Sequence, residues 1–351
     1  MRIAVMGAGS IGTVVGALIA KSGQDVVLID ADEPNVAALN AQGATVKGFL
    51  DITVPVRAIT PAQMEGIYDL VVLTTKQTFN DVALKQILPH LGDSSTVCTL
   101  QNGIPEESVA TRVGPQRTIG GTVGFGATWL EPGVSMLTST LPVLEKYAFD
   151  IGELDGQLTP RIYAIQKVLS AVGGCTVVPD FMAIRWAKLL MNATFSGMSA
   201  ALGCTFGDVL ENPDAMEVLA HIADETIKVA RACGYRLAKM QGIDMESLEL
   251  KPGDRLDDKM PLYRAVWGPH VKLKASMLQD LEKGRKTEIA YINGYVCRKG
   301  REKNVPTPYN DFAVSLVSAA ELRKKVPDFT SNLEHVRDFL ASKITTPAAK
   351  A

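Results

Sequence analysis

The stretch that decides the fold is Gly7-Ala8-Gly9-Ser10-Ile11-Gly12, a GxGxxG pattern close to the N-terminus. It directly follows an apolar run at residues 2–6 and opens the helix-like segment 10–22, which stops at a glycine. In such a strand–turn–helix the glycines permit a tight turn, close approach of the backbone to a pyrophosphate, and close packing of helix on strand. The helix N-terminus then offers N–H groups to the phosphates. The pattern predicts a dinucleotide site, with a ligand-free glycine turn as the weaker alternative.

Short apolar runs alternate with helical patterns through the first half of the chain. Runs that read as buried strands lie at 2–6, 25–30, 69–74 and 95–100, and a helical stretch lies near 78–90. This alternation indicates a parallel sheet covered on both faces. Residues 117–152, rich in Gly, Thr and Val, suit further strands that finish the same sheet. We therefore predict an α/β protein with a Rossmann-type dinucleotide-binding domain over residues 1–179.

Asp30 ends the second predicted strand, where an acidic residue is expected to bind the ribose hydroxyls of adenosine. A carboxylate at this place also repels the 2′-phosphate of NADPH. No Arg or Lys occurs between Asp30 and Val46 to receive such a phosphate. The sequence therefore favours NADH over NADPH, and a solvated, loop-facing carboxylate is the alternative for Asp30.

Polar residues also follow two later strands. Thr75 and Lys76 come after the strand at 69–74, and Asn102 follows the strand at 95–100. Open α/β sheets bind their ligands outside the carboxyl ends of the strands. We therefore expect these three residues to face the cofactor, while a solvated lysine and a plain Asn-Gly turn are the simpler interpretations.

The composition changes near residue 181, where glycine becomes scarcer and Met, Ala and Leu become more frequent. Segments with helical periodicity lie at 181–202, 213–234, 271–282, 286–304 and 309–325. A charged stretch with Pro and Gly at 243–269 suggests an exposed insertion or lid. We predict an all-helical substrate and catalytic domain over 180–327, followed by a partly disordered C-terminal extension at 328–351.

Lys188, Asn192 and Ser196 are spaced four residues apart and so share one face of the helix predicted over 181–202. A lysine in so apolar a segment must be paired, desolvated or directed into a cleft. Such a lysine is a candidate general acid. Glu288 opens the later segment 286–304, and its simplest interpretation is a first-turn acid beside Thr287 as the helix cap.

The composition also excludes several kinds of partner. The balance of 36 Lys plus Arg against 38 Asp plus Glu gives 36 − 38 = −2, which argues against a nucleic-acid partner. The apolar run 3–20 imitates a membrane segment, but its glycines favour a strand–turn–helix, so we expect no membrane association. The five cysteines form no CxxC and the histidines have no metal-ligand spacing, so no metal site is expected. These features favour a cytoplasmic protein, and they leave a homodimer open.

The sequence resembles the ketopantoate reductase family, the 2-dehydropantoate 2-reductases of pantothenate biosynthesis. The resemblance rests on GAGSIG at 7–12, TKQ at 75–77, LQNGI at 100–104, WAKLLMN at 186–192, and SMLQDLEKGRKTEIAYINGYV at 276–296. It implies reduction of a 2-keto acid by NAD(P)H with Lys188 as general acid. It also implies that Glu288 assists the lysine and that Asn102 positions lysine and substrate, both lying beside the cofactor. Ser276 and Asn192 are implied to bind the substrate.

The chain departs from the family pattern at two places that bear on specificity. Ser196 stands where the family has a further substrate-binding asparagine, and Asp30 replaces an arginine that selects NADPH. We predict reduction of ketopantoate to pantoate, with an NAD-dependent D-2-hydroxyacid dehydrogenase for branched or aromatic 2-keto acids as the alternative. A non-catalytic nicotinamide-binding sensor is a remote third interpretation, because a binding module has no need of Lys188 and Glu288.

Overall fold

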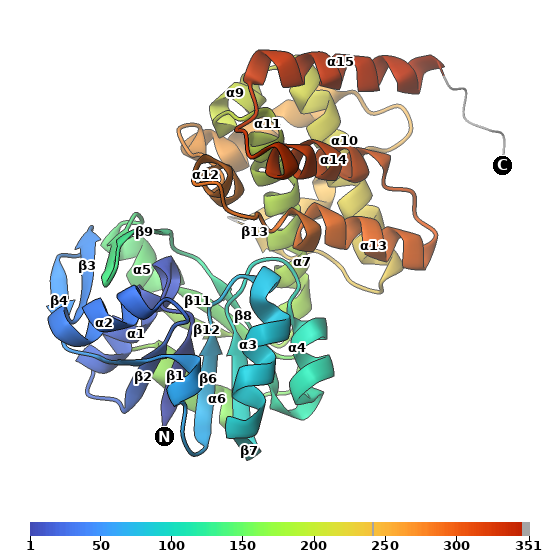
Figure 1. Cartoon of the computed structure of the whole chain (residues 1–351). Coiled ribbons are helices and arrows are strands. Elements are labelled where there is room, and N and C mark those ends of the chain that lie inside the picture. The colour runs from blue at the N-terminus through green and yellow to red at the C-terminus, as the bar shows by residue number, and fades with distance from the viewer. Residues whose placement is uncertain (241, 346–351) are drawn as a thin grey trace. The chain divides into compact units, whose positions relative to one another are not determined.

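The computed structural model describes residues 1–240 and 242–345, with side chains described up to residue 343. These residues form two compact units, one ending at Phe181 and the other beginning at Met182 (Figure 1). The sequence placed this change at about residue 179. The first unit is built around β-sheet and the second around helices, so the predicted fold class is confirmed.

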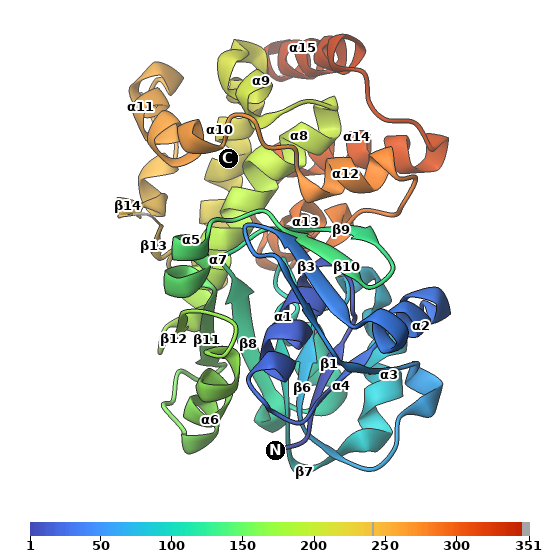
Figure 2. The same ribbon diagram turned by 90° about the vertical axis from the view of Figure 1, so that its left-hand side faces the viewer.

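An eight-stranded sheet forms the centre of the first unit (Figure 2). Its strands run in the order β12 (Cys175–Val177), β11 (Phe149–Glu153), β8 (Thr118–Val123), β7 (Leu91–Thr99), β6 (Tyr68–Leu73), β1 (Ile3–Met6), β2 (Val26–Ile29) and β5 (Arg57–Ile59). Every neighbouring pair is parallel except β8 with β11. Strand β1 pairs with β2 on one side and with β6 on the other, so the strand order reverses beside β1. Open α/β sheets bind their ligands at such a switch point.

Helices cover both faces of this sheet because successive strand side chains point to opposite faces. Ile3 and Val5 of β1 join the apolar core on one face, where α1 and α6 pack, and Ala4 and Met6 join the core under α3 and α4. The helices of this unit are α1 (Ser10–Lys21), α2 (Glu33–Gln42), α3 (Asn80–Ile87), α4 (Glu106–Val113), α5 (Leu141–Tyr147) and α6 (Pro160–Leu169).

Four other strands form a second, smaller sheet in the order β4 (Ile52–Val54), β3 (Ala44–Gly48), β10 (Val134–Leu137) and β9 (Ala127–Glu131). Helix α1 packs against this sheet as well as against the main one, so residues 12–19 are all buried. A helix buried on all sides is apolar on all sides, which explains the membrane-like run near the N-terminus. The expectation that all of 117–152 finishes the main sheet was wrong for β9 and β10. Leu137 of β10 lies in the core beside α1 instead.

The second unit is a set of helices gathered around the long helix α10. Its helices are α7 (Phe181–Met191), α8 (Gly197–Leu202), α9 (Phe206–Glu211), α10 (Pro213–Ala232), α11 (Leu256–Trp267), α12 (Ser276–Glu282), α13 (Asn293–Lys303), α14 (Pro308–Arg323) and α15 (Phe329–Thr345), with a π-turn at Asn192–Ser196. Contrary to the all-helical prediction, a two-residue hairpin of β13 (Lys239–Met240) and β14 (Ile243–Asp244) interrupts them. Short 3₁₀ turns occupy several connections in both units, at Pro61–Gln63, Gln77–Phe79, Leu88–His90, Pro115–Arg117, Met245–Leu248, Gly268–His270 and Ile289–Tyr291.

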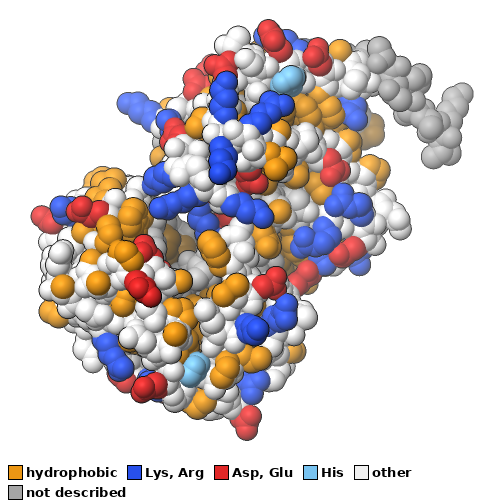
Figure 3. All heavy atoms as spheres, viewed as in Figure 1, with side chains coloured by type: hydrophobic (Ala, Val, Ile, Leu, Met, Phe, Trp, Pro, Cys, Tyr) orange, Lys and Arg blue, Asp and Glu red, His pale blue; other side chains and the backbone are white. Residues whose placement is uncertain are grey.

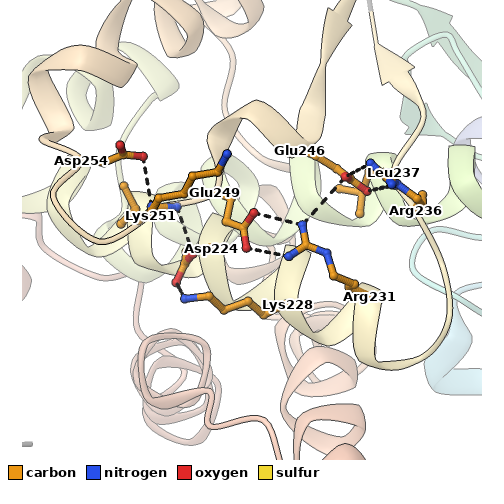
Figure 4. Close-up of polar contacts among 10 residues, drawn as sticks. Asp224, Lys228, Arg231, Arg236, Leu237, Glu246, Glu249, Lys251 and Asp254 are labelled. Carbon is orange, nitrogen blue, oxygen red and sulfur yellow. Dashed lines mark hydrogen bonds and ion pairs between the residues drawn. The ribbon is translucent and has the colours of Figure 1, made fainter.

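The segment 243–269 packs on the helical unit at both of its ends, so the expectation of an exposed insertion holds only for its middle, residues 251–258. Its apolar residues Met245, Leu248, Tyr263, Val266 and Trp267 are all buried. Two of its charged residues, Glu246 and Glu249, fasten the segment to α10 and the residues that follow it, while the charged residues between 251 and 258 are exposed. Figure 4 shows these contacts, which include Arg231 with Glu249 at 2.8 Å, Arg236 with Glu246 at 2.7 Å, and the Leu250 N–H donating to Asp224 at 3.0 Å.

The C-terminal segment continues the helical unit instead of forming a separate extension. Helix α15 packs against α8 and α10, and its side chains Leu333 and Val336 are buried. Phe339 also stacks on Phe312 of α14, with ring centroids 4.1 Å apart. Only part of 328–351 was predicted to be disordered; α15 (Phe329–Thr345) occupies most of it, and residues 346–351 lie outside the described residues.

Within the described part of the chain, no helix combines the length and the apolar character that a membrane span requires. On the face seen in Figure 3, Lys and Arg side chains occur among Asp and Glu side chains on both units. This mixture matches the near balance of charges in the sequence.

Candidate active site

The loop between β1 and α1 requires glycine at its first and third glycine positions. Gly7 has φ +103°, and a Cβ there would lie 2.8 Å from the backbone nitrogen of Thr75. A Cβ on Gly12 would lie 1.8 Å from the carbonyl oxygen of Gly7. The tight turn and the close helix–strand packing that the sequence predicted are therefore both present.

Side chains from three elements hold this loop in place. The Thr74 hydroxyl donates to the Gly7 carbonyl at 2.7 Å. The Ala8 carbonyl accepts from the Thr13 hydroxyl at 2.8 Å and from the buried Asn35 amide at 3.0 Å. Asn35 was not predicted, because its partner lies 27 residues away and no local pattern marks the pairing.

Gly9 lies next to open space, as the predicted approach of a pyrophosphate requires. It is exposed, its φ is −76°, and a Cβ built on it meets no atom within 4 Å. The fold itself therefore does not require glycine here, whereas close approach of a pyrophosphate does. The first turn of α1 leaves N–H groups without intrahelical partners beside this open space.

The side chains of Ser10 and Ile11 have other contacts, so only the backbone of these two motif residues is available to a ligand. The Ser10 hydroxyl accepts from the Trp129 N–H of β9 at 3.0 Å, and Ile11 packs against the core. The Ser10 carbonyl also accepts from the Ser135 hydroxyl at 2.8 Å. These contacts join the glycine loop to the second sheet.

Asp30 follows β2, where the sequence placed it, and its carboxylate binds the glycine loop. One oxygen accepts from the Ala8 N–H at 2.7 Å and the other from the Asp32 N–H at 3.0 Å. The residue is partly exposed, and each carboxylate oxygen can accept a further hydrogen bond. The carboxylate is therefore fixed in orientation and still able to receive a hydroxyl.

Thr75, Lys76 and Asn102 lie in the loops that follow β6 and β7, and all three are partly exposed. Buried amides join the two loops: Gln101 donates to the Thr75 carbonyl at 2.8 Å, and Gln77 donates to the Asn102 carbonyl. Both glutamines belong to the blocks that carry the family resemblance. The sequence marked them as a match but did not indicate that they hold the loops together.

In the helical unit, Lys188, Asn192 and Ser196 are partly exposed on a helix whose other neighbouring positions are mostly buried. Trp186, Ala187, Leu189 and Leu190 are each 0–1% exposed, as are Ala193 and Phe195. The three predicted residues are therefore accessible polar side chains on a mostly buried helix, whose other partly exposed residues, Met182, Ile184 and Met191, are apolar.

The helix leaves α geometry within this stripe. A π-turn spans Asn192–Ser196, and the Gly197 N–H bonds back to the Asn192 carbonyl, five residues earlier. Residues four apart on an α-helix drift by about 40° around its axis, whereas a π-turn winds more slowly. Ser196 thus stays closer to the side of the helix that carries Lys188 than an uninterrupted helix would place it.

Glu288 is buried, with 7% exposure, and lies at the start of the 3₁₀ turn Ile289–Tyr291. Helix α13 begins only at Asn293, so the expectation of a first-turn acid in an α-helix was wrong. The Thr287 hydroxyl accepts from the Ile289 N–H at 3.2 Å and donates to Glu321 of α14 at 2.6 Å. Glu288 is therefore placed by a turn that is tied to α14.

Ser276 is exposed at the first position of α12. This helix packs against α8 and against the π-turn, and the Ala275 N–H donates to the Ser199 hydroxyl at 3.3 Å. The substrate residues implied by the resemblance thus come from neighbouring elements of one unit. Apart from Glu288, the predicted cofactor residues come from the other unit.

Thiolate and metal chemistry find no support in the described residues. Burial raises the pKa of the Cys175, Cys204 and Cys297 thiols to about 12, so they stay protonated at neutral pH. No group of three or more His, Cys, Asp or Glu side chains is arranged to hold a metal ion in that part of the chain.

Comparison with known proteins places both units in one family. Residues 3–147 match the family described as ketopantoate reductase PanE/ApbA, and residues 180–321 match its C-terminal domain. A 2-dehydropantoate 2-reductase of Pyrococcus horikoshii is 30% identical over 323 residues, which cover 92% of this chain and 98% of that protein. Another, of Archaeoglobus fulgidus, is 29% identical over 91% of this chain and 98% of its own length.

Solved structures show the same architecture. A D-mandelate dehydrogenase with NADH and anilino(oxo)acetate has a TM-score of 0.77 and 25% identity, covering 92% of this chain and 99% of that one. A 2-dehydropantoate 2-reductase from Geobacter metallireducens has a TM-score of 0.75 and 28% identity, covering 91% of this chain and 100% of that one. The chain therefore belongs to the ketopantoate reductase family and is an NAD(P)-dependent 2-keto acid reductase.

Proposed function

We propose that this reductase converts ketopantoate to pantoate, with Lys188 as the general acid. The observation that carries the proposal is that Lys188, Asn192 and Ser196, the polar stripe of a mostly buried helix, are all partly exposed. NAD(P)H, when bound, supplies the hydride that the keto carbon receives. The Lys188 ammonium stabilises the negative charge that develops on the keto oxygen and then gives that oxygen a proton, which leaves a neutral amine.

The other residues of the helical unit orient these groups. Glu288 is buried, and a buried carboxylate requires a positive or hydrogen-bonding neighbour, so it suits a residue that orients the lysine. Asn192 and Ser276 hold the carboxylate end of the substrate through an amide N–H and a hydroxyl. Ser196 presents a hydroxyl to the same substrate from the end of the π-turn.

The first unit binds the cofactor through the glycine loop and the loops after β2, β6 and β7. The backbone N–H groups of residues 9–12 receive the pyrophosphate, and Asp30 receives the ribose hydroxyls. Thr75, Lys76 and Asn102 line the carboxyl ends of the next two strands. Asn102 and Glu288 are the residues that the resemblance places beside both cofactor and substrate.

We expect NADH to be preferred over NADPH because Asp30 carries a negative charge where the 2′-phosphate of NADPH would lie. Asp30→Ser should raise the KM for NADH about tenfold, the cost of one hydrogen bond to a charged group, and lower the KM for NADPH. Steady-state kinetics with both cofactors measures the change. Asp25→Ser, at the exposed opposite end of β2, is the control and should change neither KM. A wild-type protein that strongly prefers NADPH would contradict this assignment.

The second candidate substrate is a branched or aromatic 2-keto acid, reduced to a D-2-hydroxy acid. Ser196 and Asp30 favour it because both depart from the ketopantoate reductase pattern, and the D-mandelate dehydrogenase with NADH has a similar fold. Turnover of ketopantoate, 2-ketoisovalerate and phenylglyoxylate, compared by kcat/KM, decides between them. We expect ketopantoate to give the highest value, and a higher value for phenylglyoxylate would establish the alternative.

We also propose a cytoplasmic location and keep a homodimer as a prediction. The five cysteines form no disulfide in the part of the chain that the structure describes, and three of them are buried, which suits a reducing compartment. Sedimentation of the purified chain tests the oligomeric state.

A further inference from the structure

A chain of buried hydrogen bonds connects the π-turn to helix α10. The Asn293 amide donates to the Ala193 carbonyl at 2.9 Å and to the Asn310 side-chain oxygen at 3.0 Å. The Asn310 amide in turn donates to a Glu225 carboxylate oxygen at 2.8 Å. Asn293 and Asn310 are 0% exposed, and Glu225 is buried. The turn that carries Asn192 and Ser196 is therefore tied to three other helices.

The Glu225 end of this chain is firmly anchored. Its two carboxylate oxygens also accept from the backbone N–H groups of Tyr309 and Asn310, each at 2.9 Å, in the first turn of α14. Burial raises the pKa of Glu225 to about 7, and these hydrogen bonds act against the rise. The neighbouring Asp224 carboxylate adds to the rise. Because the oxygens are held from several directions, the Asn310 amide has one orientation.

The Asn293 amide donates to the Ala193 carbonyl, a carbonyl inside the π-turn where the regular α-helical pattern of backbone donors is interrupted. A π-turn shifts the backbone pattern from four to five residues, so carbonyls within it need other donors. The Thr194 hydroxyl donates to the Leu190 carbonyl at 2.8 Å, and the Asn293 amide donates to the Ala193 carbonyl. Side chains thus donate to one carbonyl just before the turn and to one within it.

The side-chain oxygen of Asn293 lowers the stability of the folded protein. This oxygen is buried and has no hydrogen-bond partner among the described residues, a state that is unfavourable for any polar atom. An apolar side chain of the same shape would avoid this cost. The two hydrogen bonds that the amide donates, one to Ala193 and one to Asn310, therefore explain why an asparagine occupies this position.

Gly197 makes room for the Asn293 amide beside the turn. A Cβ on Gly197 would lie 2.7 Å from the Asn293 side-chain oxygen and 3.2 Å from its nitrogen. The backbone of Gly197 is helical, with φ −62°, so nothing in its own conformation requires glycine. The space above it is needed by Asn293.

We propose that Asn293 is a positioning residue for the keto-acid site, because its amide fixes the π-turn that presents Asn192 and Ser196 to the substrate. Asn310 and Glu225 fix Asn293 in turn. The proposal rests on the proposed substrate role of Asn192 and Ser196. Lys188 precedes the π-turn, on α7, so a disturbed turn moves the substrate-holding residues more than the general acid.

The test is a separation of KM from kcat in two variants. Asn293→Ala removes both donated bonds, and Gly197→Ala keeps every hydrogen-bonding group while displacing the amide. Each should raise the KM for the keto acid at least tenfold, lower kcat no more than about threefold, and leave the Kd for NADH unchanged. Gly197→Ala also favours helix, so it decides the question if Asn293→Ala does not fold. An unchanged keto-acid KM in a folded variant overturns the proposal.

Asn332→Ala is the matched control. Asn332 also donates its amide to a helix carbonyl, that of Ala201 in α8 at 2.6 Å, beyond the π-turn. Its loss should leave the keto-acid KM unchanged, and an equal rise would show that general loosening of the helix causes the effect. Asn192→Ala separates this proposal from the proposed function. If it leaves KM unchanged, the assigned substrate residues are wrong; if it raises KM while Asn293→Ala does not, only the positioning role fails.

Discussion

Replacing Lys188 by alanine is expected to lower kcat for 2-keto acid reduction by two to four orders of magnitude, since general acid catalysis contributes about 10²–10⁴-fold. The ammonium is proposed to supply both the charge that stabilises the developing alkoxide and the proton that neutralises it. Alanine provides neither. The glycine loop and Asp30 are in the other unit and remain intact. Steady-state turnover together with fluorescence titration of NADH measures both properties, and the Kd for NADH should stay unchanged.

Two further variants show which property of Lys188 matters. Lys188→Arg keeps a positive charge on the helix but does not release its proton at neutral pH, so it should recover only part of the lost rate. Lys325→Ala changes an exposed lysine of the same unit, beyond the end of α14, and should turn over normally. A near-normal kcat of Lys188→Ala would show that Lys188 is not the general acid.

Gly9→Ala is expected to raise the Kd for NADH more than 100-fold without lowering the thermal stability of the protein. The added methyl group meets no atom of the protein within 4 Å, so the fold accommodates it. It occupies the space through which the pyrophosphate must approach the N–H groups of α1. Loss of two hydrogen bonds to a charged group costs about 3–6 kcal/mol, which exceeds a 100-fold change in affinity. NADH titration and a thermal melt measure the two effects.

Two other glycines provide the comparison. Gly12→Ala would place a methyl carbon 1.8 Å from the Gly7 carbonyl oxygen, so it should lower both Tm and cofactor affinity. Gly268→Ala, in the helical unit, also meets no atom within 4 Å and should change neither. Tight NADH binding by Gly9→Ala would mean that the pyrophosphate does not approach the loop at this residue.

Local sequence patterns were sufficient wherever a few consecutive residues decide the structure. The N-terminal strand, glycine turn and helix are present as predicted, and so are the later strands of the main sheet. Each is decided by the apolar pattern or the glycines of a few consecutive residues. The stripe of Lys188, Asn192 and Ser196 also appeared where the spacing placed it. The chemistry of the sites remains a prediction: Lys188, Asn192 and Ser196 are partly exposed, and Glu288 is buried.

Segments whose partners are distant in the chain were interpreted less well. Residues 243–269 contain many charges and were expected to be exposed, yet Arg231 and Asp224 lie on α10 and bind residues of that segment. Strands β9 and β10 have the composition of the main sheet but pair in a second sheet around α1. In both cases the deciding contacts join residues far apart in sequence, which no local window contains.

The sequence by itself determined the dinucleotide loop, the change from α/β to helical structure, and the family of the chain, because glycine spacing, periodicity and motif blocks are local. Only the tertiary structure decided that the helix carrying Lys188 continues into a π-turn and that Asn293 donates a hydrogen bond to it. That hydrogen bond joins residues 100 positions apart. It can form only after α10, α13 and α14 have packed together, so no local sequence pattern contains it.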